Sequence, residues 1–394
     1  MKPIVKIKIQ ENLEDMQMRL KTVALVGVAC FVAALFAPAA DAEQLVPGSV
    51  LVWPYVDTDA TVISITNSYL VNWDDENNPQ GGMLVGGYEE CAGGPPIKAA
   101  GQTDVHFMFF FQDENDRCFE TNWDVKLSAQ DHASFLVADE IGQNTTGWLV
   151  AFAAEPDEQD AGGNPVPWSF DFLMGQAWNV ETGDDYQWSY NAYAFLSANH
   201  ADVPADPCDR DTYSADPYLD FDGNEYERWG DKLLLPRFFE QGATKDSKLV
   251  LISPLSTFHD FPTDEHWGRY KVTFGTLFWN NDENGNGFPF SRTTNFECQF
   301  EGTLSDVSLQ FEDLGGTDIN NDDIEEQQTG WGIFDGFNLV DNTGAQITND
   351  PPLLGVFIQY NTADQNNQGS AAANFFTRGF NDTPAQITYR QPNP

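Results

Sequence analysis

The strongest constraint on the fold is a series of short runs rich in β-branched and aromatic residues, separated by clusters of Gly, Asn, Asp and Pro. β-Branched and aromatic side chains pack well on a pleated sheet, whereas the separating residues favour turns. Such runs cover residues 61–66, 106–111, 147–153, 248–252, 270–279 and 353–360. Amphipathic helical periodicity is nearly absent after residue 42. The pattern therefore predicts an all-β protein.

An internal repeat indicates how the strands are organised. Five segments recur in the same order in the two halves: residues 62–66 and 249–253, 113–115 and 282–284, Cys118 and Cys298, 146–148 and 329–331, and 192–196 and 371–376. Repeated matches in one order indicate duplication of a structural unit. We therefore expect two tandem β-sandwich-like units, residues 43–199 and 217–394, joined by an Asp- and Pro-rich linker over residues 200–216.

Residues 1–42 have the features of a secretory signal peptide. Two basic residues precede an apolar run over residues 23–36, and Ala40-Asp41-Ala42 is typical of a cleavage site. The run is shorter than the ~20 residues that span a bilayer. Acidic residues before Met18 do not suit a signal peptide, so we expect translation to start at Met18. The sequence predicts export to the periplasm, the cell surface or the medium, without membrane insertion after cleavage.

The charge balance limits the classes of binding partner that we expect. The chain has 61 Asp and Glu against 19 Lys and Arg, a formal net charge of −42. A surface this negative repels phosphate backbones and anionic lipid headgroups, so no nucleic-acid partner is expected. The charge suits either a saline habitat or a surface layer cross-linked by calcium. Aromatic residues at 13% argue against intrinsic disorder.

Cysteines after the signal segment predict disulfide bonds. They are Cys91, Cys118, Cys208 and Cys298. An even number in an exported chain favours disulfides and allows three pairings. We favour Cys91–Cys118 and Cys208–Cys298, which keep each bond within one half of the chain. No two of them have C-x-x-C spacing, which argues against a zinc site.

Two acidic segments resemble calcium-binding loops, in which alternating oxygen side chains surround the ion. The first has Gly at the sixth position but Thr293 at the twelfth, where a Glu is expected. The second lacks the Gly. The alternative is that Asn, Asp and Gly form ordinary hairpin turns. Calcium is the only cofactor that the sequence suggests. Its candidate ligands are Asp282, Asn284 and Asn286 in the first segment and Asp318, Asn320 and Asp322 in the second.

Three tryptophans are candidate ligand-binding residues. Trp168, Trp178 and Trp188 recur every ten residues. An exposed indole face stacks on a sugar ring, so these residues could form a carbohydrate platform. They would share one face only on a continuous strand longer than usual. The alternative is packing in the core or between units.

Catalytic motifs are not evident in the sequence. It contains no G-x-S-x-G elbow, P-loop or H-E-x-x-H motif. His259 and His266 lie close together, but their spacing matches no metal-ligand motif. The many carboxylates supply pairs that suit glycoside hydrolysis, and no particular pair stands out. An enzyme is not expected.

Several segments resemble an uncharacterised group of secreted bacterial proteins. The matching segments are residues 48–51, 63–67, 105–111, 133–139, 146–153, 172–175 and 298–304. The resemblance implies export and a duplicated β fold, without an established activity. Residues 72–100, which include Cys91, form an insertion relative to that group.

These observations predict a soluble, exported, non-enzymatic protein with a structural or binding role at the cell surface or in the periplasm. Its expected partner is a cell-surface glycan or protein. Carbohydrate binding through exposed tryptophans is the alternative function, and a glycan-active hydrolase is the third.

Overall fold

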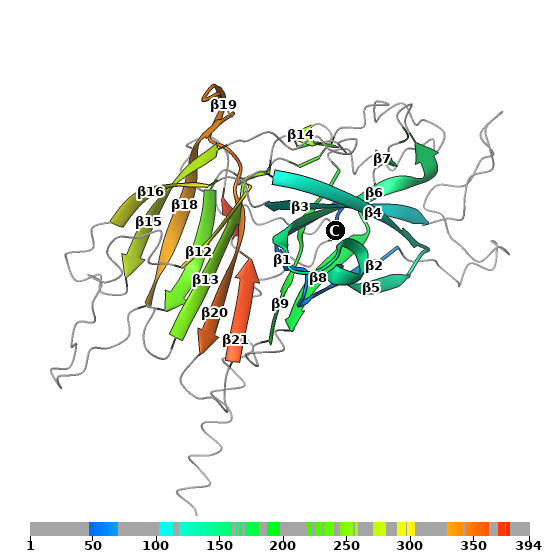
Figure 1. The fold of residues 1–394 in the computed structure, drawn as a ribbon, viewed down its shortest axis with the longest axis horizontal. Helices are drawn as coiled ribbons and strands as arrows, with labels where there is room; N and C mark the ends of the chain where they lie inside the picture. The colour runs from blue at the N-terminus through cyan, green and yellow to red at the C-terminus, as the bar shows by residue number, and fades with distance from the viewer. Residues whose placement is uncertain are drawn as a thin grey trace, which may run out of the picture. The chain divides into compact units, whose positions relative to one another are not determined.

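The computed structural model describes strands and short connections between residues 47 and 378 (Figure 1). The described residues are 47–69, 102–112, 118–159, 163, 165–167, 170–180, 187–197, 219–221, 226–227, 229–230, 232–239, 245–254, 257–258, 271–280, 290–296, 298–303, 329–341, 343–361, 369–374 and 376–378. All of them belong to the unit Gln44–Pro394. The predicted signal segment lies outside them.

The first half of the chain forms two antiparallel sheets (Figure 1). A six-stranded sheet has the order β10-β1-β6-β3-β4, with β7 paired to β6, and a four-stranded sheet has the order β5-β2-β8-β9. The strand bounds are β1 Val50–Asp57, β2 Thr61–Asn67, β3 Thr103–Gln112, β4 Cys118–Leu127, β5 His132–Leu136, β6 Thr146–Gln159, β7 Pro165–Pro167, β8 Leu173–Val180, β9 Gln187–Asn191 and β10 Tyr193–Phe195. A short helix, α2 (Val137–Ile141), follows β5.

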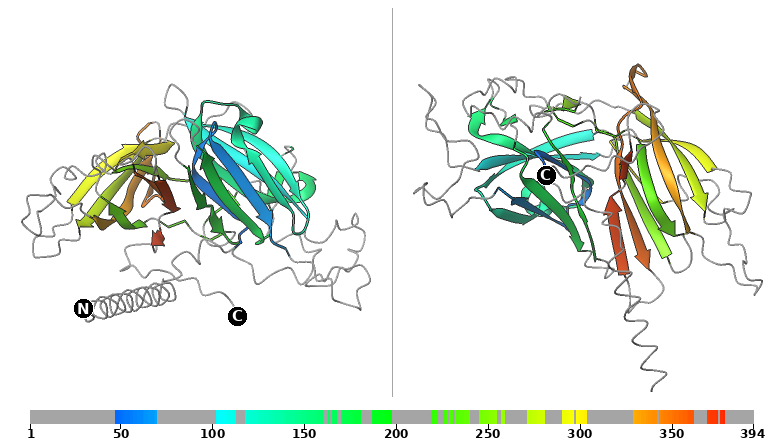
Figure 2. Two further views of the ribbon diagram at one scale, coloured as in Figure 1. Left: turned by 90° about the horizontal axis from the view of Figure 1, so that it is seen from below. Right: turned by 180° about the vertical axis from the view of Figure 1, so that it is seen from behind.

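The second half repeats this strand order in sheets of its own (Figure 2). Its six-stranded sheet has the order β22-β12-β18-β15-β16, with β19 paired to β18, and its four-stranded sheet has the order β17-β13-β20-β21. The small β11-β14 sheet is additional. The strand bounds are β11 Leu219–Asp220, β12 Lys232–Phe239, β13 Lys245–Ile252, β14 Thr257–Phe258, β15 Lys271–Asn280, β16 Phe290–Phe296, β17 Gln299–Gly302, β18 Thr329–Val340, β19 Gln346–Asn349, β20 Leu354–Asn361, β21 Gly369–Asn374 and β22 Phe376–Arg378.

By its place in the strand order, β1 corresponds to β12, β6 to β18, β3 to β15, β4 to β16 and β10 to β22. A shared irregularity supports this correspondence. The register of β1 against β6 shifts between Trp53 and Val56, and that of β12 against β18 shifts between Leu235 and Phe238. Each shift contains a proline, Pro54 in β1 and Pro236 in β12. Proline cannot donate a ladder hydrogen bond and is found at such bulges.

The all-β prediction is confirmed, and two hydrophobic clusters form the core. One lies between the two sheets of the first half and includes Trp53, Ile63 and Phe107. The other contains the opposite face of the first six-stranded sheet and the core of the second half, including Met108 and Phe274. The linker predicted over residues 200–216 lies outside the described residues, so the division into domains stays a prediction.

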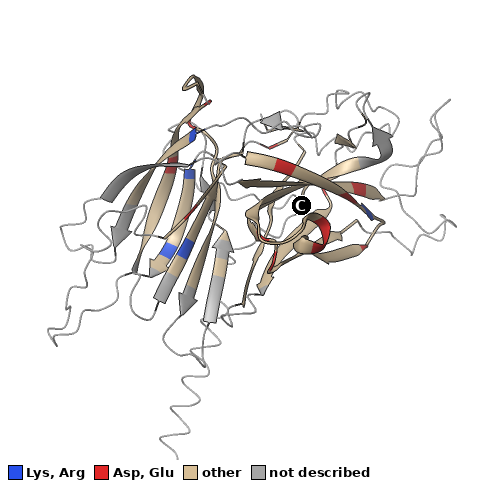
Figure 3. Cartoon of the chain, viewed as in Figure 1, with Lys and Arg blue, Asp and Glu red and all other residues tan. Residues whose placement is uncertain are grey.

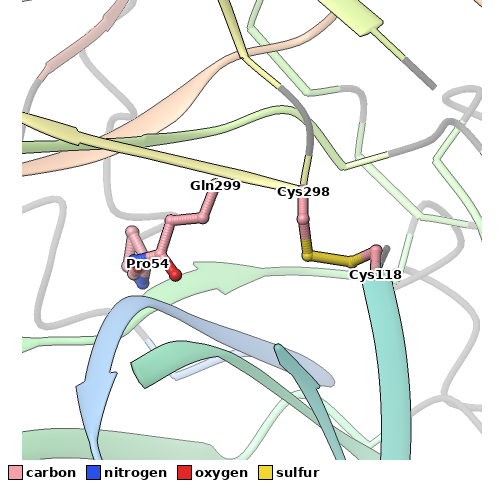
Figure 4. The surroundings of a disulfide bond; sticks show 4 residues. All are labelled: Pro54, Cys118, Cys298 and Gln299. Atoms are coloured by element: carbon pink, nitrogen blue, oxygen red, sulfur yellow. A yellow bond between two sulfur atoms is a disulfide. The ribbon is translucent and has the colours of Figure 1, made fainter. Parts of the chain in front are cut away.

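The predicted disulfide pairing is wrong. Cys118 bonds to Cys298, and the two residues are 180 positions apart and buried (Figure 4). Cys118 begins β4, whereas Cys298 lies just before β17, so the two cysteines are not at corresponding positions of the repeat. The bond joins the two halves, where the prediction kept each bond within one half. Cys91 and Cys208 lie outside the described residues.

Candidate functional site

The outer face of the β5-β2-β8-β9 sheet is the candidate site. Successive side chains of a strand point to opposite faces of its sheet. In β2 every second residue from Thr61 is buried, and the residues between them are half-buried. Their cross-strand partners complete the outer face. We call this surface the polar face, and its members are Val62, Ser64, Thr66, His132, Ser134, Leu136, Met174, Gln176, Trp178, Ser189 and Asn191.

The polar face is uncharged. None of the residues of β2, β5, β8 and β9 is Asp, Glu, Lys or Arg, in a chain of which 20% is charged. Carboxylates and basic groups lie on other elements, among them β4 and α2 (Figure 3). A strongly acidic protein therefore presents one neutral sheet surface.

Trp178 is the large aromatic residue of this surface. Its side chain is 52% exposed, and it lies between Val62 and Ser189 on the neighbouring strands. The indole Nε1 donates a hydrogen bond to Oε1 of Gln176 at 2.5 Å. This bond restrains the ring while leaving about half of the residue accessible to a ligand.

A hydrogen-bonded group of hydroxyls surrounds His132 on the same face, across β2 from the strand of Trp178. The imidazole Nδ1 lies 2.8 Å from Oγ1 of Thr66, and Nε2 lies 2.9 Å from Oγ of Ser134 and 3.3 Å from Oγ of Ser64. Oγ of Ser134 also donates to Oγ of Ser64 at 3.3 Å. A hydroxyl both donates and accepts, so the group can rearrange around a polyhydroxylated ligand.

The same group does not form a nucleophilic triad within the described residues. A serine nucleophile needs a base whose second nitrogen is held by an orienting group, usually a carboxylate. Here Nδ1 of His132 faces the hydroxyl of Thr66. The adjacent Asp131 instead accepts hydrogen bonds from the backbone of His132 and from Ser128, which lowers the pKa of its carboxyl.

The three tryptophans predicted as ligand-binding residues do not form one platform. Trp188 is 4% exposed and stacks on Tyr190, with ring centroids 5.7 Å apart. In the ladder between β8 and β9, Trp188 lies opposite Asn179, whereas Trp178 lies opposite Ser189, so the two indoles are on opposite faces. Trp188 is therefore a core residue. Trp168 lies outside the described residues.

The predicted calcium ligands also lie outside the described residues. They are Asp282, Asn284, Asn286, Asp318, Asn320 and Asp322. Where the structure does describe the chain, it groups no three His, Cys, Asp or Glu residues that could hold a metal. No helix among the described residues is long and apolar enough to cross a membrane. His132 was the site residue that sequence reasoning missed, because its partners come from two neighbouring strands.

A second polar cluster joins the bulge of β1 to the second half. Nζ of Lys248 donates to the hydroxyl of Tyr55 at 2.6 Å and lies 2.7 Å from Oε2 of Glu301. It also lies 4.0 Å from the centroid of the Tyr55 ring, a cation–π distance. Nε2 of Gln299 donates to the carbonyl of Pro54 at 3.3 Å. All these groups have protein partners, so the cluster is structural.

Comparisons with known proteins give little guidance. No family model and no curated protein matches the chain. A solved structure described as "Crystal structure of PBSX exported protein XepA" is similar at 7% identity, over 74% of this chain and 83% of that chain, with a TM-score of 0.15. A TM-score this low does not show a shared fold.

Proposed function

We propose that this protein is an exported β protein that binds a neutral glycan on the polar face. The observation that carries the proposal is an exposed tryptophan on a sheet without a charged residue, in a chain of net charge −42. Ligand sites combine apolar surface with a few placed polar groups that orient the ligand. Trp178 supplies the apolar surface, and the amide of Gln176 and the hydroxyls of Ser64 and Thr66 supply the polar groups.

The chemistry of a sugar matches this combination. A pyranose ring has an apolar face of C–H groups, which stacks on an aromatic ring, and a rim of hydroxyls, which donate and accept hydrogen bonds. A neutral sheet avoids the cost of desolvating charged side chains when a ligand covers it. The acidic remainder of the surface repels anionic polysaccharides. We therefore expect neutral polysaccharides to bind and anionic ones to bind weakly.

Export is the second part of the proposal. It is supported by the signal-like residues 1–42 and by the Cys118–Cys298 bond, because disulfides persist in oxidising compartments. We also propose that the chain contains two β-sandwich-like units related by duplication. The repeated strand order and the shared bulge of β1 and β12 support this interpretation.

Calcium binding by the acidic loops stays a separate prediction. Thermal unfolding of residues 43–394 with calcium and then with EGTA, at fixed high ionic strength, tests it. At a calcium concentration ~100 times the dissociation constant, one specific site adds about 2.7 kcal/mol. The gain should be lost in the Asp282→Ala variant, and an unchanged melting temperature would contradict the prediction.

Tryptophan fluorescence tests the glycan proposal. We expect residues 43–394 to show a saturable spectral shift with at least one soluble polysaccharide from a panel of neutral glucans, mannans and xylans. The Trp178→Ala variant should bind about 5- to 150-fold more weakly, since a lost stacking contact costs on the order of 1–3 kcal/mol, the range for a base on an aromatic side chain. The Phe337→Ala variant is the matched control, because Phe337 is 47% exposed in another sheet.

Two results would overturn the proposal. One is the absence of binding to every polysaccharide of the panel by isothermal calorimetry, which does not depend on the fluorescence of Trp178. The other is equal affinity for the wild type and the Trp178→Ala variant, which would place any binding elsewhere.

A further inference from the structure

The residues of the polar face form rows that run across its strands. Residues opposite one another on neighbouring strands have adjacent side chains, and the strand registers define two such rows from β5 through β2 and β8 to β9. The first, which we call the stacking row, consists of Leu136, Val62, Trp178 and Ser189. The second, which we call the hydrogen-bonding row, consists of Ser134, Ser64, Gln176 and Asn191.

Apolar and polar residues separate by row and not by strand. Along β2 the outer face changes from Val62 to Ser64, and along β8 from Trp178 to Gln176, within a step of roughly 7 Å. Across the strands, the stacking row stays apolar from β5 to β8, and the hydrogen-bonding row stays polar from β5 to β9, over roughly 10–14 Å. A polymer presents the same groups along its length, so it fits a surface that is uniform in one direction. On the polar face that direction crosses the strands.

Hydrogen bonds connect the two rows and set their donors and acceptors. The indole of Trp178 donates to Oε1 of Gln176, which leaves the two N–H donors of that amide for a ligand. In the hydrogen-bonding row, Oγ of Ser134 donates to Oγ of Ser64 at 3.3 Å. An apolar strip therefore lies directly beside a strip of hydroxyls and amides.

The two parts of this surface are too far apart for one sugar to contact both. Trp178 lies on β8 and Ser134 on β5, and β2 lies between these strands. Two strand spacings amount to roughly 10 Å, about twice the width of one sugar ring (~5 Å). A ring stacked on Trp178 therefore reaches β2 and β9 but not Ser134. Further rings joined to it in a line would cover the distance.

We propose that the ligand is a linear glycan whose chain crosses the strands of the polar face. Successive rings lie over the stacking row, and their hydroxyls bond to the hydrogen-bonding row. This inference rests on the proposed function and narrows the ligand to a stretch of about three to four consecutive rings, since three strand spacings cover roughly 14 Å. Trp178 stacks one ring, and Val62 and Leu136 lie under the rings that extend toward β5.

Isothermal calorimetry with ligands of increasing length tests the proposal. The exported protein, purified after expression of the full chain, is titrated with oligosaccharides of one to about six units from the same glucans, mannans and xylans. We expect no measurable binding of the monosaccharides. In at least one series the affinity should rise about tenfold or more from the dimer to the tetramer and then level off, because each added ring contacts another strand until the rows end.

A variant at the β5 end of the hydrogen-bonding row tests the direction of the chain. Ser134→Ala should lower the affinity for the tetramer about 2- to 12-fold, the effect of one lost hydrogen bond. It should leave the affinity for the dimer unchanged, since a dimer on Trp178 does not reach β5. Thr343→Ala is the matched control, because Thr343 is an exposed hydroxyl residue between β18 and β19 and should affect neither ligand.

Two results would overturn the linear-chain proposal while leaving glycan binding in place. One is an affinity that reaches its full value with a monosaccharide or dimer. The other is a Ser134→Ala variant that binds dimer and tetramer with the same relative change, or with none. Failure of the proposed function is distinguishable from both, because no polysaccharide or oligosaccharide of any length would then bind, or Trp178→Ala would leave every affinity unchanged. In that case the linear-chain proposal is overturned as well.

Discussion

The two six-stranded sheets share strand order and register, yet their outer faces differ in exposure. Met108 of β3 and Leu277 of β15 occupy corresponding positions, and Met108 is fully buried whereas Leu277 is 36% exposed. The four-stranded sheets differ in the opposite sense, because Trp178 is exposed and the corresponding Ile358 is buried. The strands alone therefore do not determine which face meets solvent. The segments and the neighbouring unit packed on each sheet determine it.

The outer faces of the two four-stranded sheets differ in what lies against them. The second half buries the outer face of its four-stranded sheet, where Val250 and Ile358 join the same hydrophobic cluster as Tyr190 of the first half. The first half leaves its own four-stranded sheet open, with polar residues on it. Of these two corresponding faces, one is packed inside the protein and the other meets solvent.

The largest expected effect comes from placing a charge at the corresponding positions Met108 and Leu277. Met108→Asp removes a buried side chain and leaves an unpaired carboxylate in the core, so we expect a loss of about 5 kcal/mol or more in unfolding free energy. Leu277→Asp should cost about 1 kcal/mol, because its carboxylate remains hydrated. Urea unfolding of both variants measures the difference. Equal losses would show that the two faces are equally buried in solution.

The second-largest expected effect is the difference in stability between alanine variants of the two tryptophans in the β5-β2-β8-β9 sheet. Trp188→Ala should destabilise the protein by about 3–5 kcal/mol, because it leaves a cavity beside Tyr55 and Tyr190. Trp178→Ala should change stability by less than about 0.5 kcal/mol, since the indole is half-exposed. Thermal and urea unfolding provide the measurement. A large loss in Trp178→Ala would mean that this residue is structural and would weaken the glycan proposal.

The sequence was sufficient to predict the strands but not their faces. Runs of β-branched and aromatic residues identified β2, β3, β6, β13, β15 and β20, and short repeated segments indicated the second copy. The same patterns could not show that Trp188 is buried and Trp178 exposed, because that depends on the β8–β9 register and on packing against Tyr55. His132 was missed for a similar reason, since its hydroxyl partners come from β2 and β5.

The cysteines show a second limit of prediction from the sequence, which concerns how distant segments pack. The match of Cys118 with Cys298 was interpreted as part of the repeat, yet the two residues belong to non-corresponding strands and bond to each other. A disulfide between distant segments depends on how the two halves pack. The sequence contains no local signal for that packing. In contrast, the Pro54 bulge and its counterpart in β12 were a local signal that could have been found.

Breaking the disulfide should have the third-largest effect. The Cys118→Ser/Cys298→Ser variant opens a loop of 180 residues, and we expect a loss of about 3 kcal/mol in unfolding free energy. It should also separate the unfolding of the two halves, which the bond couples. Calorimetry of the oxidised protein should show one transition and that of the variant two. A single transition with unchanged midpoint would show that the shared hydrophobic clusters alone couple the halves.

The smallest effect concerns Asp57, which ends β1 at the position where β12 has Phe239. Burial raises the pKa of its carboxyl above the ordinary value of 3.8, and Asp59 and Glu301 raise it further, while Lys248 lowers it. A raised pKa means that the folded state favours the protonated carboxyl. Asp57 therefore stabilises the fold below pH 3.8, and this contribution is lost as the pH rises through the folded-state pKa.

The Asp57→Asn variant mimics the protonated carboxyl and keeps an oxygen that can accept from the backbone of Asp59. We expect it to be more stable than the wild type at pH 7, by less than about 1 kcal/mol because Asp57 is partly exposed to solvent. The difference should vanish near pH 3. Asp341→Asn is the control of opposite sign, since hydrogen bonds from Thr343 and the backbone of Ala345 lower the pKa of Asp341. The opposite result would be a variant that is less stable than the wild type at pH 7 and gains relative to it as the pH falls. That result would mean that the Asp57 carboxylate stabilises the fold, at a position where β12 has a phenylalanine.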